Sequence, residues 1–320
     1  MRPDPTQTRL SARAPHRAAA SVRRCISRLL PRAQRDRPDT AARAGLEPLE
    51  PRLLLSGDLS VAVSGTTLKI TGDAQDNQIV IDGSSGDLVL SGQDGELFDG
   101  QTGPLTFAQP IQSIVIKLTK GGDNAITVQD ATLAKKVTLK SGNGGDTVLL
   151  NRLTARDVKL KTKDGADTIT IMDSTISGNL KINTKDGIDQ ILIDPTTIDG
   201  KLDINSGRGN DRIEIEASTV ASKTKINASA GDDDLDFRSV DPSNPLRLAG
   251  NVKINLGSGD DRITVKISNA SAVARFDGRV RVNGGGGTDL VDCVADLAIA
   301  PLFAHTPTGK KVETVQNCPV

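Results

Sequence analysis

Carboxylates on glycine-rich turns are the groups in this sequence best suited to chemistry. Short segments such as Gly209-Asn-Asp211 and Gly259-Asp-Asp261 place acidic side chains directly after a glycine. Calcium takes six to eight oxygen ligands, and a glycine-rich turn can point its backbone carbonyls at an ion. One turn offers too few oxygens, so an ion would lie between two adjacent turns. The carboxylates that we expect to ligate calcium are Asp211, Asp232, Asp233, Asp260, Asp261 and Asp289.

A purely structural role explains the same turns. Each recurring glycine would take a left-handed conformation, and each aspartate would accept hydrogen bonds from backbone N–H groups. Two of the turns carry Lys163 and Lys185, whose ammonium groups would neutralise nearby carboxylates and compete with a metal. Both interpretations stay open from the sequence, and calcium is favoured in the carboxyl-terminal half, where the turns are richest in acid.

The turns recur along the chain and define a repeat. Each aspartate that opens an x-Ile-x-Ile strand is followed by another after 21 or 22 residues, and the last two steps are 28 residues. A glycine stands two residues before each of them. A fixed period of about 20 to 50 residues indicates a solenoid or array. The aspartates are Asp146, Asp167, Asp189, Asp211, Asp233, Asp261 and Asp289.

The elements that carry the turns are predicted to be strands. Ile169 and Ile171 alternate with polar residues, which is the period-2 pattern of a strand. Three short strands in about 22 residues fit one triangular coil, and coils of this kind stack at about 4.8 Å. We therefore predict an all-β fold, a single-stack right-handed parallel β-helix (solenoid) with about 22 residues per coil. One inward-facing stack is expected to contain Ile171, Ile193, Ile215 and Val265.

The predicted order along the chain has four parts. Residues 1–45 are rich in Arg, Ala and Pro and are expected to form a disordered basic leader. Residues 46–58 form a short motif, residues 59–292 the β-helix and residues 293–320 a C-terminal cap. The two longer periods hold insertions at Arg238–Leu248 and Ser268–Arg279, which are expected to emerge as loops on one side and to offer contacts to a partner.

The motif lies at Leu49-Glu-Pro-Arg-Leu-Leu-Leu55 and is followed by Ser56-Gly-Asp58. It resembles the LEPR-XLL motif (Leu-Glu-Pro-Arg-x-Leu-Leu), which occurs near the start of many large exported proteins of planctomycetes and some proteobacteria. The resemblance implies a secreted or cell-surface protein whose motif acts in sorting. It implies nothing about an activity.

The turn sequences carry a second resemblance. Ser206–Asp211 and Leu256–Asp261, each followed by an x-Ile-x strand, resemble the hemolysin-type calcium repeat, Gly-Gly-x-Gly-x-Asp-x-apolar-x. That family implies calcium held between turns of neighbouring coils by carboxylates and backbone carbonyls. This chain departs from the family because it has one turn per coil on one edge, whereas the family has a copy every nine residues on both edges.

Charge and composition limit the classes of partner that this chain is expected to bind. Residues 1–57 hold 12 Arg and 5 acidic residues, and the whole chain is neutral, so the remainder carries a formal charge of −7. A mildly acidic β-domain argues against nucleic acid as its partner. The chain has five Phe, no Tyr and no Trp, and it has no apolar run long enough to span a membrane. A disulfide between Cys293 and Cys318 would close the carboxyl end of an exported protein.

The function expected from these observations is a secreted or cell-surface β-solenoid that acts as a structural or adhesive module. Its partner would be an extracellular or surface polysaccharide or protein, and we expect no enzymatic activity. The alternatives are a calcium-binding repeat protein with ions between coils, and a β-helix polysaccharide lyase or hydrolase. The recurring asparagines, Asn183 to Asn283, are expected to hydrogen-bond along the stack rather than to bind a ligand.

Overall fold

The structure is a computed structural model that describes residues 58–92, 96–240, 242–267, 274–295, 308–310 and 314–316. All regular secondary structure in these residues is β-strand, so the predicted all-β class is confirmed. No helix there is long and apolar enough to cross a membrane. The predicted leader, and the motif apart from Asp58, lie outside the described residues.

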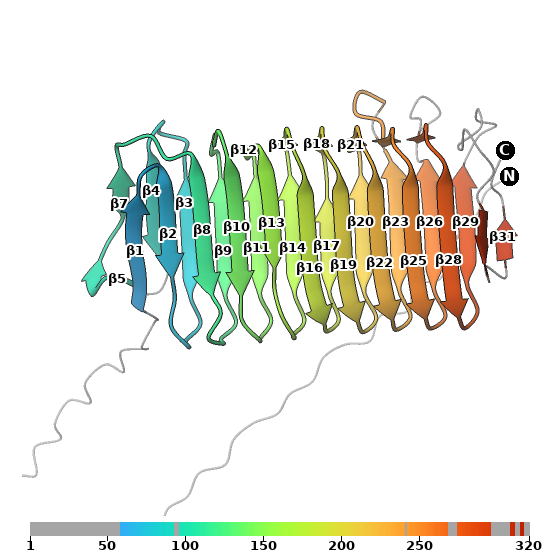
Figure 1. The fold of residues 1–320 in the computed structure, drawn as a ribbon, viewed down its shortest axis with the longest axis horizontal. Coiled ribbons are helices and arrows are strands. Elements are labelled where there is room, and N and C mark those ends of the chain that lie inside the picture. The colour runs from blue at the N-terminus through green and yellow to red at the C-terminus, as the bar shows by residue number, and fades with distance from the viewer. Residues whose placement is uncertain are drawn as a thin grey trace, which may run out of the picture. The chain divides into compact units, whose positions relative to one another are not determined.

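The strands form three sheets, and a typical coil of the stack contributes one strand to each sheet (Figure 1). The first sheet contains β1 (Asp58–Ser64), β2 (Thr67–Thr71), β5 (Leu97–Phe98), β6 (Gln101–Thr102), β8 (Ser113–Leu118), β10 (Lys136–Ser141), β13 (Asp157–Lys161), β16 (Leu180–Asp186), β19 (Leu202–Arg208), β22 (Thr224–Ala230), β25 (Val252–Ser258), β28 (Val280–Gly286) and β30 (Thr308–Lys310). The second sheet contains β3 (Gln78–Asp82), β4 (Leu88–Gly92), β7 (Leu105–Phe107), β9 (Ala125–Gln129), β11 (Thr147–Asn151), β14 (Thr168–Met172), β17 (Gln190–Ile193), β20 (Arg212–Glu216), β23 (Asp234–Ser239), β26 (Arg262–Ile267), β29 (Leu290–Ala295) and β31 (Thr314–Gln316). The third sheet contains β12 (Thr154–Ala155), β15 (Ser174–Ile176), β18 (Thr196–Ile198), β21 (Thr219–Val220), β24 (Arg247–Leu248) and β27 (Arg275–Phe276).

The register between coils follows the sequence repeat. Ile169 pairs with Ile191, and Ile191 pairs with Ile213, each one period further along the chain. All three strands of these coils pair in parallel with their counterparts in the next coil. This pairing is that of a β-helix, and it follows because every period presents the same alternation of polar and apolar residues.

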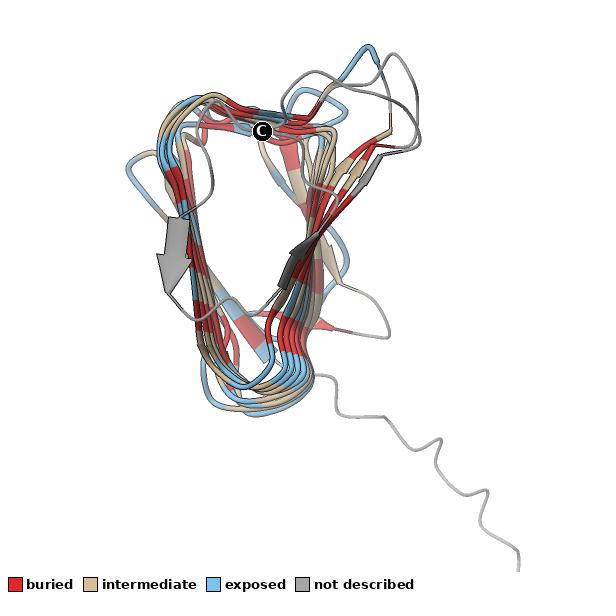
Figure 2. Ribbon diagram, turned by 90° about the vertical axis from the view of Figure 1, so that its right-hand side faces the viewer, coloured by how far each residue is buried: buried red, intermediate tan, exposed pale blue. Residues whose placement is uncertain are grey.

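Aliphatic side chains fill the interior of the coils. Seen along the stack, each coil is a loop whose buried positions alternate with exposed ones (Figure 2). Ile171, Ile193 and Ile215 are fully buried, and the same row continues through Phe237 to Val265. The predicted inward stack is confirmed, and the register assigned from the sequence is correct.

The amino end departs from the regular coil. β1 pairs antiparallel with β2, and β4 lies antiparallel between β3 and β7. These hairpins cover the first coil, which would otherwise expose the end of its apolar core. At the carboxyl end, β29 continues past residue 292, and β30 and β31 pair in parallel with β28 and β29. The segment predicted as a cap therefore adds further strands to both long sheets.

The insertions and the cysteines lie near the carboxyl end. The first insertion connects β23 to β24 and leaves the coil as a loop, as predicted, whereas residues 268–273 of the second lie outside the described residues. Cys293 is buried and disulfide-bonded. The other two cysteines, Cys25 and Cys318, lie outside the described residues, so its pairing with Cys318 stays a prediction.

Candidate functional site: the glycine–aspartate turns

The glycine–aspartate turns join each strand of the first sheet to the second-sheet strand of the same coil, along the lower edge in Figure 1. Their glycines have positive φ, as in Gly187 (157°) and Gly207 (116°). A Cβ on Gly207 would lie 1.4 Å from the carbonyl oxygen of Lys185 in the preceding coil. Glycine is therefore required there by the close approach of two backbones as well as by its φ.

The repeating aspartates form one buried row, which we call the carboxylate ladder. In each coil the Oδ1 atom accepts a hydrogen bond from the backbone N–H of the equivalent residue in the preceding coil, as from Asp189 to Asp211 at 3.0 Å and from Asp211 to Asp233 at 2.9 Å. The predicted capping of backbone N–H groups is thus confirmed, although the capped N–H lies in the neighbouring coil. The ladder consists of Asp146, Asp167, Asp189, Asp211, Asp233, Asp261 and Asp289.

Two asparagines precede the ladder in the same row. Asn124 accepts the backbone N–H of Asn77 with its Oδ1 atom. Its Nδ2 atom donates to the Oδ1 atom of Asp146 at 2.8 Å and to the carbonyl of Gly122 at 3.1 Å. An amide therefore uses both of its polar atoms at this position. In the carboxylates that follow, from Asp146 to Asp261, the Oδ2 atom is buried and has no hydrogen-bond partner among the described residues.

The residue five positions before each ladder aspartate divides the row into two stretches. In the first stretch it is a hydroxyl residue, Ser141, Thr162, Thr184 or Ser206. In the second stretch it is Ala228, Leu256 or Gly284, all buried. No hydrogen bond of ordinary geometry joins Ser206 to Asp211, yet its hydroxyl lies near enough to lower the pKa of that carboxyl.

Burial raises the pKa of the ladder carboxyls from Asp146 to Asp261, because the charged carboxylate loses its hydration. The pKa of Asp211 is raised to about 6, and that of Asp233, beside Ala228, to about 8. Neighbouring ladder carboxylates add to the rise for Asp233. Burial raises the pKa of Asp167 to about 7 although the Thr162 hydroxyl lowers it, and repulsion from Asp189 and Asp146 adds a smaller rise. The hydroxyl and the charged neighbours together set each value.

The six carboxylates predicted to bind calcium fall into two groups. Asp211, Asp233, Asp261 and Asp289 belong to the ladder and are buried. Asp232 and Asp260 are exposed on the turns, where their Oδ1 atoms accept the backbone N–H groups of Asp260 and Thr288. In the part of the chain that the structure describes, no three His, Cys, Asp or Glu side chains converge in a group suited to a metal ion. The calcium site stays a prediction.

Many of the backbone carbonyl oxygens near a turn already accept hydrogen bonds from the neighbouring coil. The N–H of Gly209 donates to the carbonyl of Ala230, and that of Gly231 donates to the carbonyl of Ser258. Together with the ladder bonds, these contacts supply the structural role that was the alternative to calcium. The oxygens left for a cation are the second lone pairs of the carbonyls and the Oδ2 atoms of the ladder. In the coils with lysine, Lys163 donates to the carbonyl of Thr119 at 3.4 Å.

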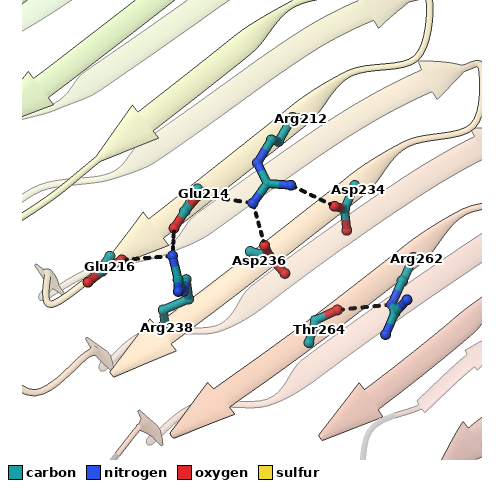
Figure 3. A network of polar contacts seen from close by, with 8 residues as sticks. All are labelled: Arg212, Glu214, Glu216, Asp234, Asp236, Arg238, Arg262 and Thr264. Carbon is teal, nitrogen blue, oxygen red and sulfur yellow. Dashed lines mark hydrogen bonds and ion pairs between the residues drawn. The ribbon is translucent and has the colours of Figure 1, made fainter. Parts of the chain in front are cut away.

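The outer faces of the two long sheets differ in how their charges are arranged. On the second sheet Arg212 contacts Glu214, Asp234 and Asp236 at 2.8–3.2 Å (Figure 3). Arg238 also contacts Glu214 and lies 3.4 Å from Glu216. On the first sheet the expected asparagine ladder is confirmed, with Nδ2 to Oδ1 distances of 2.6–3.2 Å. Its members are Asn183, Asn205, Asn227, Asn255 and Asn283.

The sequence analysis did not anticipate three of these features. They are the ion-pair network around Arg212, the hydroxyl row beside the ladder and the concentration of lysines on the first sheet. Aligning the periods by their aspartates exposes the second and third, because each forms a column of similar residues. The network lacks such a column, since Gln190 and Leu192 stand at the positions of Arg212 and Glu214 in the preceding coil, and Asp234 and Asp236 stand there in the next coil.

Comparison with family models, with curated proteins and with solved structures finds no match for this chain. The function is therefore argued from the residues and their geometry.

Proposed function

We propose that this chain is a structural or adhesive module at the cell surface or outside the cell. The observation that carries the proposal is the periodic outer surface of the first sheet, on which equivalent positions recur once per coil and an asparagine repeats over the five coils from β16 to β28. A rigid, regularly spaced surface is suited to contact with an extended polymer or with another such surface. The interior is filled with aliphatic side chains, so the surface is what the fold offers to a partner.

The place of action rests on the sequence. The Leu49–Leu55 segment resembles an export motif, and the Arg-rich residues before it suit a leader that is removed. A stack held by inter-coil backbone hydrogen bonds and a disulfide at Cys293 would tolerate conditions outside the cell. We propose no catalytic role for the ladder, because its carboxylates are buried where a sugar chain does not reach them.

Fractionation of the organism that encodes the chain tests this function. An antibody against residues 58–295 should detect the protein in the medium or on intact cells, and external protease should remove the signal from intact cells. A cytosolic enzyme is the internal control, and it should survive the protease. Detection only in the cytosol, with residues 1–45 still attached, would overturn the proposal.

Calcium binding is the second candidate, and one observation favours it. The Oδ2 atoms of Asp233 and Asp261 are buried without a hydrogen-bond partner, and no hydroxyl residue stands five positions before either aspartate. A cation at this stretch would satisfy these oxygens together with the exposed Asp232 and Asp260. Binding should stabilise the folded turns, because the ion binds the folded chain better than the unfolded one.

A matched pair of variants tests calcium. Asp232→Asn with Asp260→Asn should abolish any rise in melting temperature at millimolar calcium relative to EDTA. Asp164→Asn with Asp186→Asn removes the same number of exposed acids from the turns that carry Lys163 and Lys185, and it should leave the rise intact. Calorimetry without heat at millimolar calcium, together with a melting temperature unchanged by EDTA, would leave only the structural turn.

A further inference from the structure

Positive charge is concentrated on the outer face of the first sheet. Its nine parallel strands from β2 to β28 contain twelve Lys and Arg against three Asp. The nine matching strands of the second sheet, from β3 to β29, contain four Lys and Arg against six acidic residues. We call the outward-facing cations of the first sheet the basic face: Lys69, Lys117, Lys136, Lys140, Lys159, Lys161, Lys181, Lys225, Lys253 and Arg281.

These cations recur from coil to coil, and one carboxylate interrupts their row: Asp203 lies in register between Lys181 and Lys225. Lys225 pairs in register with Lys253, and Lys253 pairs with Arg281. Within the described part of the chain, Lys181 is the one member of the basic face with a carboxylate at ion-pair distance, Asp203 at 2.8 Å. Like charges at the coil spacing repel by about 1 kcal/mol in water, so the face costs stability as it stands. The arginines of the second sheet, by contrast, lie beside carboxylates that neutralise them. Unpaired positive charge therefore distinguishes the first sheet from the second.

We propose that the basic face binds an extended acidic polysaccharide along the axis of the coil stack. The inference rests on the proposed adhesive function and names its partner class. An anionic group once per sugar would meet a lysine or arginine about once per coil, because the coils rise by about 4.8 Å, which is similar to the length of one sugar unit. The overall charge of −7 on residues 58–320 does not prevent this, since charges beyond about 8 Å are screened at physiological salt.

The asparagine ladder gives the face a means of binding sugar hydroxyls. Asn227 and Asn255 stand two residues after Lys225 and Lys253, so they share the same outer face. A carboxamide has two N–H donors and two acceptor lone pairs, and the ladder uses one of each. Half-buried Asn255 therefore keeps a donor and an acceptor for a hydroxyl group beside the charged row, whereas Asn227 donates its second N–H to the Oγ atom of Ser229 at 2.8 Å and keeps an acceptor.

Nucleic acid fits this face less well. The nine strands of the face contain no aromatic residue on which bases would stack. A flat sheet also presents no helix or ribbon that enters a major groove. An acidic polysaccharide needs neither, since its anionic groups and hydroxyls project from a single extended chain.

Binding of the full chain to alginate, a uronic-acid polymer, tests the inference, with EDTA present so that calcium cannot bridge the two. Dextran sulfate, neutral dextran and single-stranded DNA are the comparison polymers. The face variant Lys159→Ser, Lys225→Ser, Lys253→Ser should weaken alginate binding about tenfold or more, because it removes three unpaired cations. The control variant Arg152→Ser, Arg247→Ser, Lys266→Ser removes the same charge from positions outside the first sheet and should change binding less than about twofold.

Circular dichroism and melting must first show that both variants are folded. Equal loss in the two variants would mean that binding follows net charge, and it would overturn the inference. Absence of alginate and dextran sulfate binding, or tighter binding to DNA, would overturn the partner class. If the protein is exposed on cells but binds neither alginate nor dextran sulfate, the polysaccharide proposal is wrong and the proposed adhesive function is unaffected. If the protein is cytosolic but binds alginate, the proposed function is wrong and the binding proposal is unaffected.

Discussion

Two adjacent stretches of the carboxylate ladder differ in the residues that surround their buried carboxyl groups. From Asp146 to Asp211 each carboxyl has a hydroxyl residue five positions earlier, whereas Asp233 and Asp261 follow buried Ala228 and Leu256. The geometry of the ladder bond is nearly the same in both stretches, with N to Oδ1 distances of 3.0 Å where Asp211 is the acceptor and 2.9 Å where Asp233 is the acceptor. The pKa nevertheless changes from about 6 at Asp211 to about 8 at Asp233.

This comparison shows that the two carboxyl oxygens have different roles. Oδ1 holds the preceding coil in register and is common to the whole row. Oδ2 carries no structural bond, and its surroundings decide whether the carboxyl is ionised. The aspartate is therefore needed for its single acceptor atom, and the second oxygen is the place where the two stretches diverge.

Removing the acceptor has the largest expected effect. Asp233→Leu leaves the buried N–H of Asp211 without a partner, which should lower the free energy of unfolding by about 1–3 kcal/mol. Asp233→Asn keeps the acceptor, and its Nδ2 atom can donate as that of Asn124 does. Urea unfolding at pH 8 should rank the proteins Asn variant, wild type, Leu variant, from most to least stable. A Leu variant as stable as the wild type would show that the ladder bond contributes nothing.

The next largest effect is the dependence of stability on pH, which distinguishes Asp233 from Asp211. A carboxyl whose pKa rises on folding binds its proton more tightly in the folded chain, so its contribution to stability is full below the unfolded pKa near 3.8 and is lost as pH rises through the folded pKa. For Asp233 that window extends to about pH 8, and for Asp211 to about pH 6. In EDTA, the melting temperature should fall between pH 6 and 8. Asp167 and Asp261, whose pKa values burial raises to about 7, contribute to the same fall. Asp233→Asn should therefore reduce the fall without abolishing it, and Asp211→Asn should change it least.

Exchanging the hydroxyl between coils should transfer part of this difference. Ala228→Ser places a hydroxyl where Ser206 stands one coil earlier, and it should lower the pKa of Asp233 and weaken the fall in melting temperature between pH 6 and 8. Ser206→Ala should do the opposite for Asp211. The expected changes are below about 1 kcal/mol, because the hydroxyl is one of several groups near each carboxyl. Unchanged pH profiles in both variants would assign the difference to the neighbouring carboxylates alone.

The sequence predicts the fold because one observation is repeated in every period. The alternation around Ile169 and Ile191 fixes the inward face, and the constant distance between aspartates fixes which strands pair. The hairpins of β1, β4 and β7 were not foreseen, since each occurs once and no column of the repeat supports it. Regularity makes the coils predictable, and the ends lack it.

The site was predictable in position but not in chemistry. Spacing places Asp211 and Asp233 in one row, yet whether Oδ1 faces a metal or a backbone N–H depends on the path of the turn in three dimensions. The basic face was missed for a related reason. The net charge of the whole domain is negative, and the positive charge becomes visible only when residues are sorted by sheet and by face.

The smallest expected effect concerns the backbone of one turn, the turn that precedes Asp189 in the first stretch. Lys185 has a φ of 81°, where its counterparts in the next coils include Gly207 and Gly257. A side chain at such a φ costs about 1–2 kcal/mol, and glycine loses about 0.5–1 kcal/mol of this advantage through its greater freedom in the unfolded chain. Lys185→Gly should thus be more stable than Lys185→Ala by about 0.5 kcal/mol in urea unfolding. Both variants lose the ammonium group, so their difference reports the backbone alone, and the difference between Lys185→Ala and wild type reports whether the lysine stabilises the carboxylates around it. Equal stability of the Gly and Ala variants would show that the turn accommodates a side chain at this φ without strain.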